Sequence, residues 1–129
     1  MKFKITDTKY ERIDTEREIE IEFPFYYRIE DEEYYHDYRG AEMDARSVTY
    51  GVIHKSVLGR EVCVSIWQIT TTNDGRQSFD DSWKIDHNSY APLSIISENM
   101  LRGKITQQEF EEGKNDAIDT MTKMTIYNQ

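Results

Sequence analysis

The sequence predicts an α+β domain, in which a mainly antiparallel sheet of four to five strands is followed by two C-terminal helices packed on one face of the sheet. Two observations carry this prediction. Apolar and polar residues alternate in most segments up to residue 86, as they do in strands, whereas apolar residues recur at helical spacing over 92–124. A chain of 129 residues has the usual size of one domain, so residues 1–129 are expected to form a single domain.

The first predicted strands lie on either side of a polar segment. Residues 2–6 alternate and predict a short strand, and residues 7–15 are turn-like. Residues 16–30 predict a long strand or two pieces interrupted at Pro24, which lacks a backbone donor and favours an edge strand or a bulge. Residues 30–45 show no clean period, and a loop or a short irregular helix is expected there.

The remaining strands follow one another with short connections. Residues 46–56 and 60–71 predict a hairpin, and the second of these strands is apolar on both faces, which is typical of a central strand. The sequence Asn73-Asp74-Gly75 is a strong turn signal, and residues 76–86 predict one further strand after it.

Helical spacing replaces alternation near the C-terminus. From Pro92 onward Leu93, Ile96, Met100 and Leu101 recur at helical spacing, and Gly103 is a natural end for that helix. Thr106 and Glu109 have the spacing of a capping box and predict the start of a second helix that ends near residue 124.

Charge is distributed unevenly along the chain. The net charge is −9, and the window 14–44 alone holds 12 acidic and three basic residues. The rest of the sequence is balanced. Such an acidic region repels nucleic acid and anionic lipid and attracts basic surfaces, so direct nucleic-acid binding and membrane binding are not expected. The expected partner is a protein with a basic surface.

Glutamate occupies every second position from residue 16 to 22, which on a strand lines up four carboxylates on one face. These residues form either the solvated face of an edge strand or part of a binding surface. A row as dense as a nucleic-acid backbone needs a second acidic row beside it, and residues 30–33 could supply one by folding back. The candidate partner-binding residues are Glu16, Glu18, Glu20, Glu22, Glu30, Asp31, Glu32, Glu33, Tyr34, Tyr35, Asp37 and Tyr38.

Tyrosine is concentrated in the same window. Tyr27 is in register with Phe23 and Phe25 and is expected in the core. Tyr34, Tyr35 and Tyr38 are either core residues or interface residues, since tyrosine offers a large contact area with few torsions to restrain. We therefore expect a non-enzymatic protein-binding module, comparable in composition to the small acidic inhibitors of phages and other mobile elements. Another interpretation of the acidic window is that its charge serves only solubility, in a regulatory or structural subunit.

An enzymatic alternative comes from two H-x-S triplets. His54 with Ser56, and His87 with Ser89, resemble the paired H-x-[ST] motifs of the 2H phosphoesterases. The resemblance implies that both histidines act as acid and base on a phosphodiester while the hydroxyls hold its oxygens. The second triplet departs from the pattern, because Asp86 precedes the histidine and Pro92 follows closely.

Other functional classes have little support. Cys63 is the only cysteine, and its place in an apolar run predicts a buried side chain rather than a nucleophile. No signal-peptide pattern or apolar run long enough to span a bilayer is present, so a cytoplasmic protein is expected. Asp80, Asp81, Asp86 and His87 are more typical of turn and surface roles than of a metal site, and no cofactor motif is found, so neither a metal nor a cofactor is expected.

Overall fold

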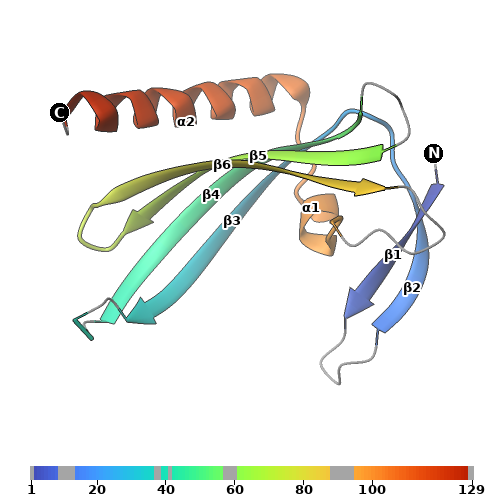
Figure 1. Cartoon of the computed structure of the whole chain (residues 1–129), viewed down its shortest axis with the longest axis horizontal. Helices are drawn as coiled ribbons and strands as arrows, with labels where there is room; N and C mark the ends of the chain where they lie inside the picture. The colour runs from blue at the N-terminus through green and yellow to red at the C-terminus, as the bar shows by residue number, and fades with distance from the viewer. Residues whose placement is uncertain are drawn as a thin grey trace.

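The computed structural model describes residues 2–8, 14–36, 39–40, 42–56, 61–87 and 95–127. These residues form a two-stranded sheet, a four-stranded sheet and two helices (Figure 1). The α+β class is therefore confirmed. The small sheet is an antiparallel hairpin of β1 (Lys2–Thr8) and β2 (Asp14–Glu20).

The large sheet is an antiparallel meander in which each strand pairs with the next one in the chain, in the order β3-β4-β5-β6. Its strands are β3 (Phe25–His36), β4 (Glu42–Lys55), β5 (Glu61–Thr72) and β6 (Gln77–His87). The two inner strands are β4 and β5, as the apolar residues on both faces of 60–71 predicted. The turn at Asn73–Gly75 joins β5 to β6, which is also as predicted.

The prediction of a loop or helix over 30–45 was wrong. β3 continues to His36 and β4 begins at Glu42, and the two strands pair along this whole length. In this part of the ladder Glu32 lies opposite Arg46 on one face, and Asp31 lies opposite Ser47 on the other. Polar side chains therefore occupy both faces of the hairpin, so there is no apolar alternation to reveal a strand.

The predicted interruption at Pro24 is confirmed. β2 ends at Glu20 and β3 begins at Phe25, with a cis peptide bond between Phe23 and Pro24. The chain thus leaves the small sheet and enters the edge strand of the large one, as expected for proline.

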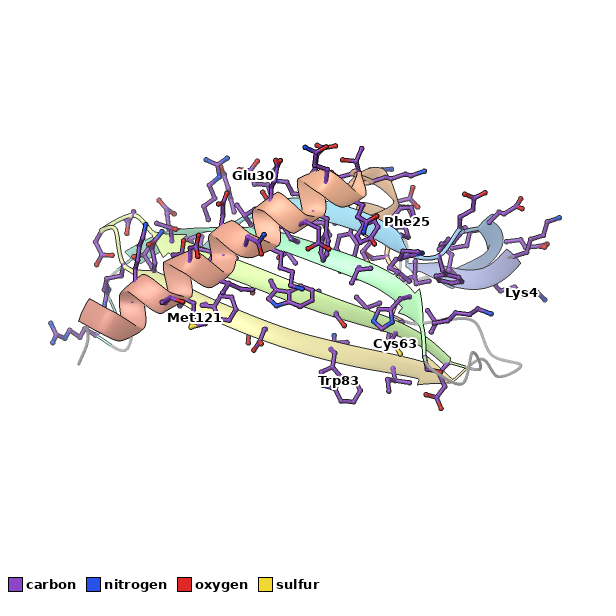
Figure 2. The ribbon with its side chains drawn as sticks, turned by 90° about the horizontal axis from the view of Figure 1, so that it is seen from above. Lys4, Phe25, Glu30, Cys63, Trp83 and Met121 are labelled. Atoms are coloured by element: carbon purple, nitrogen blue, oxygen red, sulfur yellow. The ribbon has the colours of Figure 1, made fainter. Side chains whose placement is uncertain are left out.

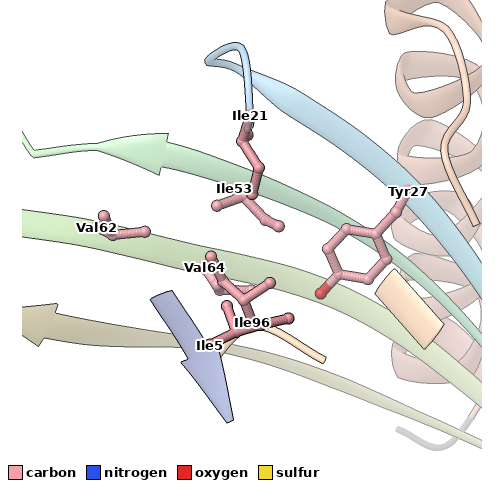
Figure 3. Packing of buried hydrophobic residues seen from close by; sticks show 7 residues of the cluster. All are labelled: Ile5, Ile21, Tyr27, Ile53, Val62, Val64 and Ile96. Carbon is pink, nitrogen blue, oxygen red and sulfur yellow. The ribbon is translucent and has the colours of Figure 1, made fainter. Parts of the chain in front are cut away.

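One face of the large sheet carries the aliphatic core. Tyr27, Ile53, Val62 and Val64 point to this face from three adjacent strands. The hairpin contributes Ile5 and Ile21, and the segment before the first helix contributes Ile96 (Figure 3). Gly51 lies opposite Tyr27, and the Tyr27 ring fills the space that a side chain on Gly51 would need.

The two helices lie on opposite faces of the large sheet. Helix α1 (Glu98–Arg102) packs Met100 and Leu101 against the aliphatic core beneath the sheet, whereas helix α2 (Gln107–Tyr127) lies above it (Figure 1). This differs from the expectation of helices sharing one face. The cause is the connection, because Gly103 accepts a hydrogen bond from the Arg28 amide and Ile105 donates one to the Tyr26 carbonyl, both of 2.9 Å. The chain therefore passes around the outer edge of β3 between the helices.

Helix α2 docks through aromatic contacts. Phe110 packs against Tyr26 and Trp67, with ring centroids 4.8 and 5.8 Å apart. Tyr50 fills the space beside Gly113, and the ammonium of Lys114 lies 4.4 Å from the centroid of the Trp67 ring.

The predicted capping box begins this helix. The Glu109 amide donates to the Thr106 hydroxyl at 3.1 Å, and the Thr106 amide donates to the Glu109 carboxylate at 3.2 Å. The helix ends at Tyr127, within a few residues of the predicted end.

Candidate functional site

The glutamate row of β2 forms the outer face of the small hairpin. Glu18, Glu20 and Glu22 are exposed, whereas Ile21 in the alternate set is buried. The hairpin register places Lys4 opposite Glu18 and Lys2 opposite Glu20. Two of these carboxylates therefore face a lysine across the ladder, which weakens the field of the row. The structure describes the backbone of Glu16 but not its side chain.

The second group of predicted residues lies elsewhere. Glu30, Asp31, Glu32 and Tyr34 belong to β3 in the large sheet, and all four are exposed. Figure 1 shows the far end of β3 and the β1–β2 hairpin on opposite sides of the molecule, and Figure 2 shows Glu30 well away from Lys4. The described carboxylates of residues 14–44 therefore form two surfaces rather than one double row.

We call the described residues Glu30, Asp31, Glu32, Tyr34 and Asp44 the acidic sheet end. An open cavity of about 620 Å³ lies at this end of the sheet. Its described lining residues are Glu32, Tyr34, Asp44, Ala45, Arg46, Thr71, Thr72 and Asn73. Tyr34 is 59% exposed, one of the most exposed large rings in the described part of the chain. The cavity thus combines carboxylates, hydroxyls and an aromatic ring at the surface.

Hydrogen bonds from the β5–β6 turn fix one rim of the cavity. The Asn73 amide donates to the Asp44 carbonyl at 2.8 Å and joins the turn to β4. The Thr72 hydroxyl donates to the Asp74 carboxylate, and the Arg76 guanidinium lies 2.9 Å from the same carboxylate. The hydrogen bond from Thr72, supported by Arg76, lowers the pKa of Asp74 below its usual value. The turn is therefore held in one conformation next to the cavity.

Charge pairing leaves the acidic sheet end with a negative excess. Glu30 forms ion pairs with Arg46 and with Arg28, the latter at 3.5 Å. Within the described ranges, no ion pair involves Asp31, Glu32 or Asp44. These three exposed carboxylates therefore keep their charge available for an external cation.

His54, from the first H-x-S triplet, is half-buried on β4 and both of its ring nitrogens are engaged. Nδ1 donates to the Lys55 carbonyl at 3.2 Å, because a carbonyl can only accept. In the neutral ring Nε2 then accepts from the Ser65 hydroxyl, also at 3.2 Å. Ser56, the serine of the same triplet, has a buried hydroxyl oxygen without a described hydrogen-bond partner. His54 is therefore hydrogen-bonded to Ser65 of β5 and not to the serine of its own triplet.

The second triplet is only partly described. The backbone pairs Glu61 with His87 and Cys63 with both His54 and Ile85. His54 and His87 thus lie two strands apart, on either side of β5. The His87 side chain lies outside the described part of the structure, as do the side chains of Glu33 and Tyr35 on β3. Asp37, Tyr38 and Ser89 lie outside the described residues altogether.

Cys63 is buried, as predicted. Burial raises the pKa of its thiol, and the neighbouring Glu61 carboxylate raises it further. Both effects disfavour the reactive thiolate. Among the residues that the structure describes, no group of three or more histidine, cysteine or acidic side chains could hold a metal ion. No described helix is long and apolar enough to cross a membrane.

Sequence reasoning missed part of the cavity. Asp44 lies in the acidic window but is not among the predicted binding residues, and the sequence predicts only a strand end at Thr71 and a turn at Asn73. These residues reach the cavity through pairing across strands, since Ala45 lies opposite Thr72. The turn signal at Asn73 was the only local indication. Comparison of the chain with protein-family models, with curated proteins and with solved structures finds no match.

Proposed function

We propose that this chain is a non-enzymatic protein-binding module that binds a basic surface of another protein through the acidic sheet end. The observation that carries the proposal is the open cavity of about 620 Å³, in which Glu32, Asp44 and the exposed Tyr34 surround a space large enough for a side chain. An arginine or lysine side chain of the partner fits this chemistry. Carboxylates accept its N–H groups and the tyrosine ring offers a cation–π contact.

The proposed module acts as a stoichiometric inhibitor of its target. A protein surface that attracts Glu32 and Asp44 is one that also attracts phosphate groups, because both ligands present closely spaced negative charge. Binding of the acidic sheet end therefore competes with DNA or RNA for that surface. The general character is that of the small acidic inhibitors carried by phages and other mobile elements.

Because the carboxylates form two surfaces, charge reversal on one surface can be compared with an equal charge reversal on the other. In one variant Glu32→Lys and Asp44→Lys reverse two charges at the cavity, and in the other Glu18→Lys and Glu20→Lys reverse two charges on the hairpin. Both variants change the net charge equally. Binding of a fluorescent arginine-rich peptide is measured by anisotropy, with circular dichroism as the check on folding.

We expect the cavity variant to lose about tenfold or more in affinity, because each lost charge-assisted contact costs about 1 kcal/mol or more. The hairpin variant is expected to retain most of its affinity, and the affinity of the parent chain is expected to fall with added salt. An equal loss in both variants would show that only net charge matters, which would support the solubility interpretation. The same pair of variants is then compared in affinity capture of the partner from the native host.

The enzymatic alternative is separated by one further variant. Replacing His54 and His87 together by alanine is expected to leave peptide binding unchanged, because neither residue lies at the acidic sheet end. If the parent chain hydrolyses a phosphodiester substrate and this variant does not, the proposed non-enzymatic function is wrong.

A further inference from the structure

Among the residues that the structure describes, the outer edge of β6 is a free strand edge. β6 pairs with β5 on one side, and no described residue pairs with its other side. Trp83 is 68% exposed and Ile85 is 38% exposed, although both are large apolar side chains. Figure 2 shows Trp83 at this edge, pointing away from the rest of the molecule. By contrast, Gly103 and Ile105 bond to the outer edge of β3 and cover part of it.

We propose that this edge pairs with β6 of a second copy of the chain in an antiparallel arrangement with twofold symmetry about Ser82. A free edge carries unpaired backbone donors and acceptors that can extend a sheet into another chain. In a twofold arrangement, directly opposed residues of the two copies point to the same face of the joint sheet. When the symmetry axis passes through Ser82, all 11 residues of β6 are paired. The result is one continuous sheet built from the two four-stranded sheets.

The charges of β6 favour this register. Centring on Ser82 places Asp80 opposite Lys84 of the second copy, and by symmetry Lys84 opposite Asp80. Opposite charges in directly paired positions stabilise a ladder. Within the described part of the chain, no ion pair involves either of these side chains, so both remain available for such contacts.

Neighbouring registers are disfavoured by the same charges. Shifting the centre by one residue toward the N-terminus places Asp81 opposite Asp81. Shifting it by one residue toward the C-terminus places Asp80 opposite Asp86. Like charges in directly paired positions destabilise a ladder, so both shifts are unfavourable. The charged residues that protect this edge from unspecific pairing therefore also select one symmetric pairing.

The apolar residues of β6 favour the same register. Phe79 lies opposite Ile85 of the second copy, and the two Trp83 rings become diagonal neighbours across the symmetry axis. These residues share the face that carries α2, because Phe79 pairs with Ile69 and Trp83 pairs with Ser65 on the same side as Trp67. Diagonal neighbours lie about 7–8 Å apart, within reach of aromatic side chains. The proposed pairing thus covers the exposed Trp83 and Ile85.

The proposal is independent of the proposed function. The acidic sheet end belongs to β3 and the adjoining part of β4, and β3 is the opposite edge strand of the sheet. Pairing through β6 leaves both acidic sheet ends free, so a dimer would present two of them.

Charge reversal and its rescue test the ion pairs. Sedimentation equilibrium of the parent chain is expected to give twice the 15.4 kDa chain mass at high concentration. Lys84→Asp places like charges opposite each other twice and is expected to weaken dimerisation about tenfold or more. The double variant Asp80→Lys with Lys84→Asp restores opposite charges and is expected to recover the affinity. A parent chain that stays monomeric at millimolar concentration, or a double variant as weak as Lys84→Asp, would overturn the proposal.

Cysteine cross-linking tests the register. Ser82→Cys places two thiols directly opposite each other at the axis, so mild oxidation is expected to give a covalent dimer. Ser78→Cys is the matched control, since it is also exposed on β6 but lies eight residues from its symmetry mate, about 26 Å at 3.3 Å per residue. The native Cys63 is buried, and the parent chain therefore gives the background level of cross-linking. Cross-linking of both variants to the same extent, or of neither, would overturn the proposed register.

Discussion

The two faces of the large sheet are covered in different ways. On the face of α1, buried aliphatic residues from the hairpin, the sheet and Ile96 form one continuous cluster. On the face of α2, a single helix crosses the sheet and makes contact mainly through aromatic rings and Lys114. This helix leaves Trp83 and Ile85 of β6 exposed. The first face carries the buried aliphatic cluster, whereas the second leaves large apolar side chains exposed.

Both faces contain the same kind of tyrosine–glycine contact, so the difference in packing between them can be measured. Each face holds a tyrosine ring against a glycine: Tyr27 against Gly51 on the first face, and Tyr50 against Gly113 on the second. Tyr27 is 1% exposed, but Tyr50 is only half-buried. The same substitution at the two glycines should therefore have different costs, because the partly exposed Tyr50 ring can shift more easily than the buried Tyr27 ring.

The largest expected effect is that of Gly51→Ala. The added Cβ would overlap the Tyr27 ring, which is packed among the buried residues of the core. We expect a loss of about 3 kcal/mol in the free energy of unfolding, the upper end of the usual cost of overpacking. Urea denaturation measures it, and the same substitution in a Tyr27→Leu background is expected to cost much less. Equal costs in the two backgrounds would show that the ring does not cause the effect.

Burial of Tyr27 also predicts a loss of stability in alkali. Desolvation raises the pKa of Tyr27 to about 12, so the folded state holds the proton more tightly than the unfolded state, whose pKa is about 10. The corresponding stability is fully present below pH 10 and is lost as the pH rises through 12. At 1.36 kcal/mol per pKa unit, the loss is roughly 2–3 kcal/mol.

This loss is measured as a difference between two chains. Urea denaturation at several pH values from 9 to 12 is compared for the parent chain and Tyr27→Phe, so that the titration of lysines and other tyrosines cancels. The stability of the parent is expected to fall more steeply. Parallel curves would contradict the burial of an ionisable hydroxyl at this position. The Tyr50→Phe variant is the control from the other face.

Gly113→Ala should have a smaller cost. In an unpacked helix this change stabilises by about 1 kcal/mol. Here the added Cβ would overlap the Tyr50 ring, so we expect a net loss of about 1–2 kcal/mol. Asn115→Ala, at an exposed position of the same helix, is expected to be neutral or slightly stabilising. If both variants are stabilising in thermal unfolding, the close approach of α2 to the sheet is wrong.

Thr106→Ala should have the smallest effect, about 1 kcal/mol, because it removes the capping box at the start of α2. The loss should concentrate in α2, so hydrogen exchange of the first turn is expected to accelerate while the exchange of core amides in β4 and β5 changes little. Thr122→Ala removes a hydroxyl that bonds within the helix, to the Ile118 carbonyl, and is expected to cost nothing. If hydrogen exchange accelerated equally throughout the chain, the capping box would instead contribute to the stability of the whole domain.

Local signals were sufficient for most elements. The break at Pro24, the turn at Asn73–Gly75 and the capping box at Thr106 were all predicted, because each depends on residues within a few positions of one another. Apolar residues on both faces predicted the central position of β5, and alternation predicted the burial of Tyr27. The strand over Glu30–His36 was missed, since it extends a ladder past the apolar core and carries polar residues on both faces.

The candidate site was only half predicted, for the same reason. Glu32 and Tyr34 come from the acidic segment that the sequence singles out, but Asp44 and Asn73 reach the cavity through the pairing of β3 with β4 and the turn after β5. No local sequence pattern predicts which residues of distant segments will come into contact.

By itself, the sequence determined the α+β class, the sites of the turns and caps, and the excess of negative charge in residues 14–44. These features depend on residues close together in the sequence and on side-chain periodicity, and neither requires tertiary contacts. Only the tertiary structure decided that the described acidic residues would separate onto two surfaces, that the helices would take opposite faces, and that no described residue would pair with the outer edge of β6. Those outcomes depend on strand register and on the path of the chain around β3, and both are set by contacts between residues far apart in the sequence.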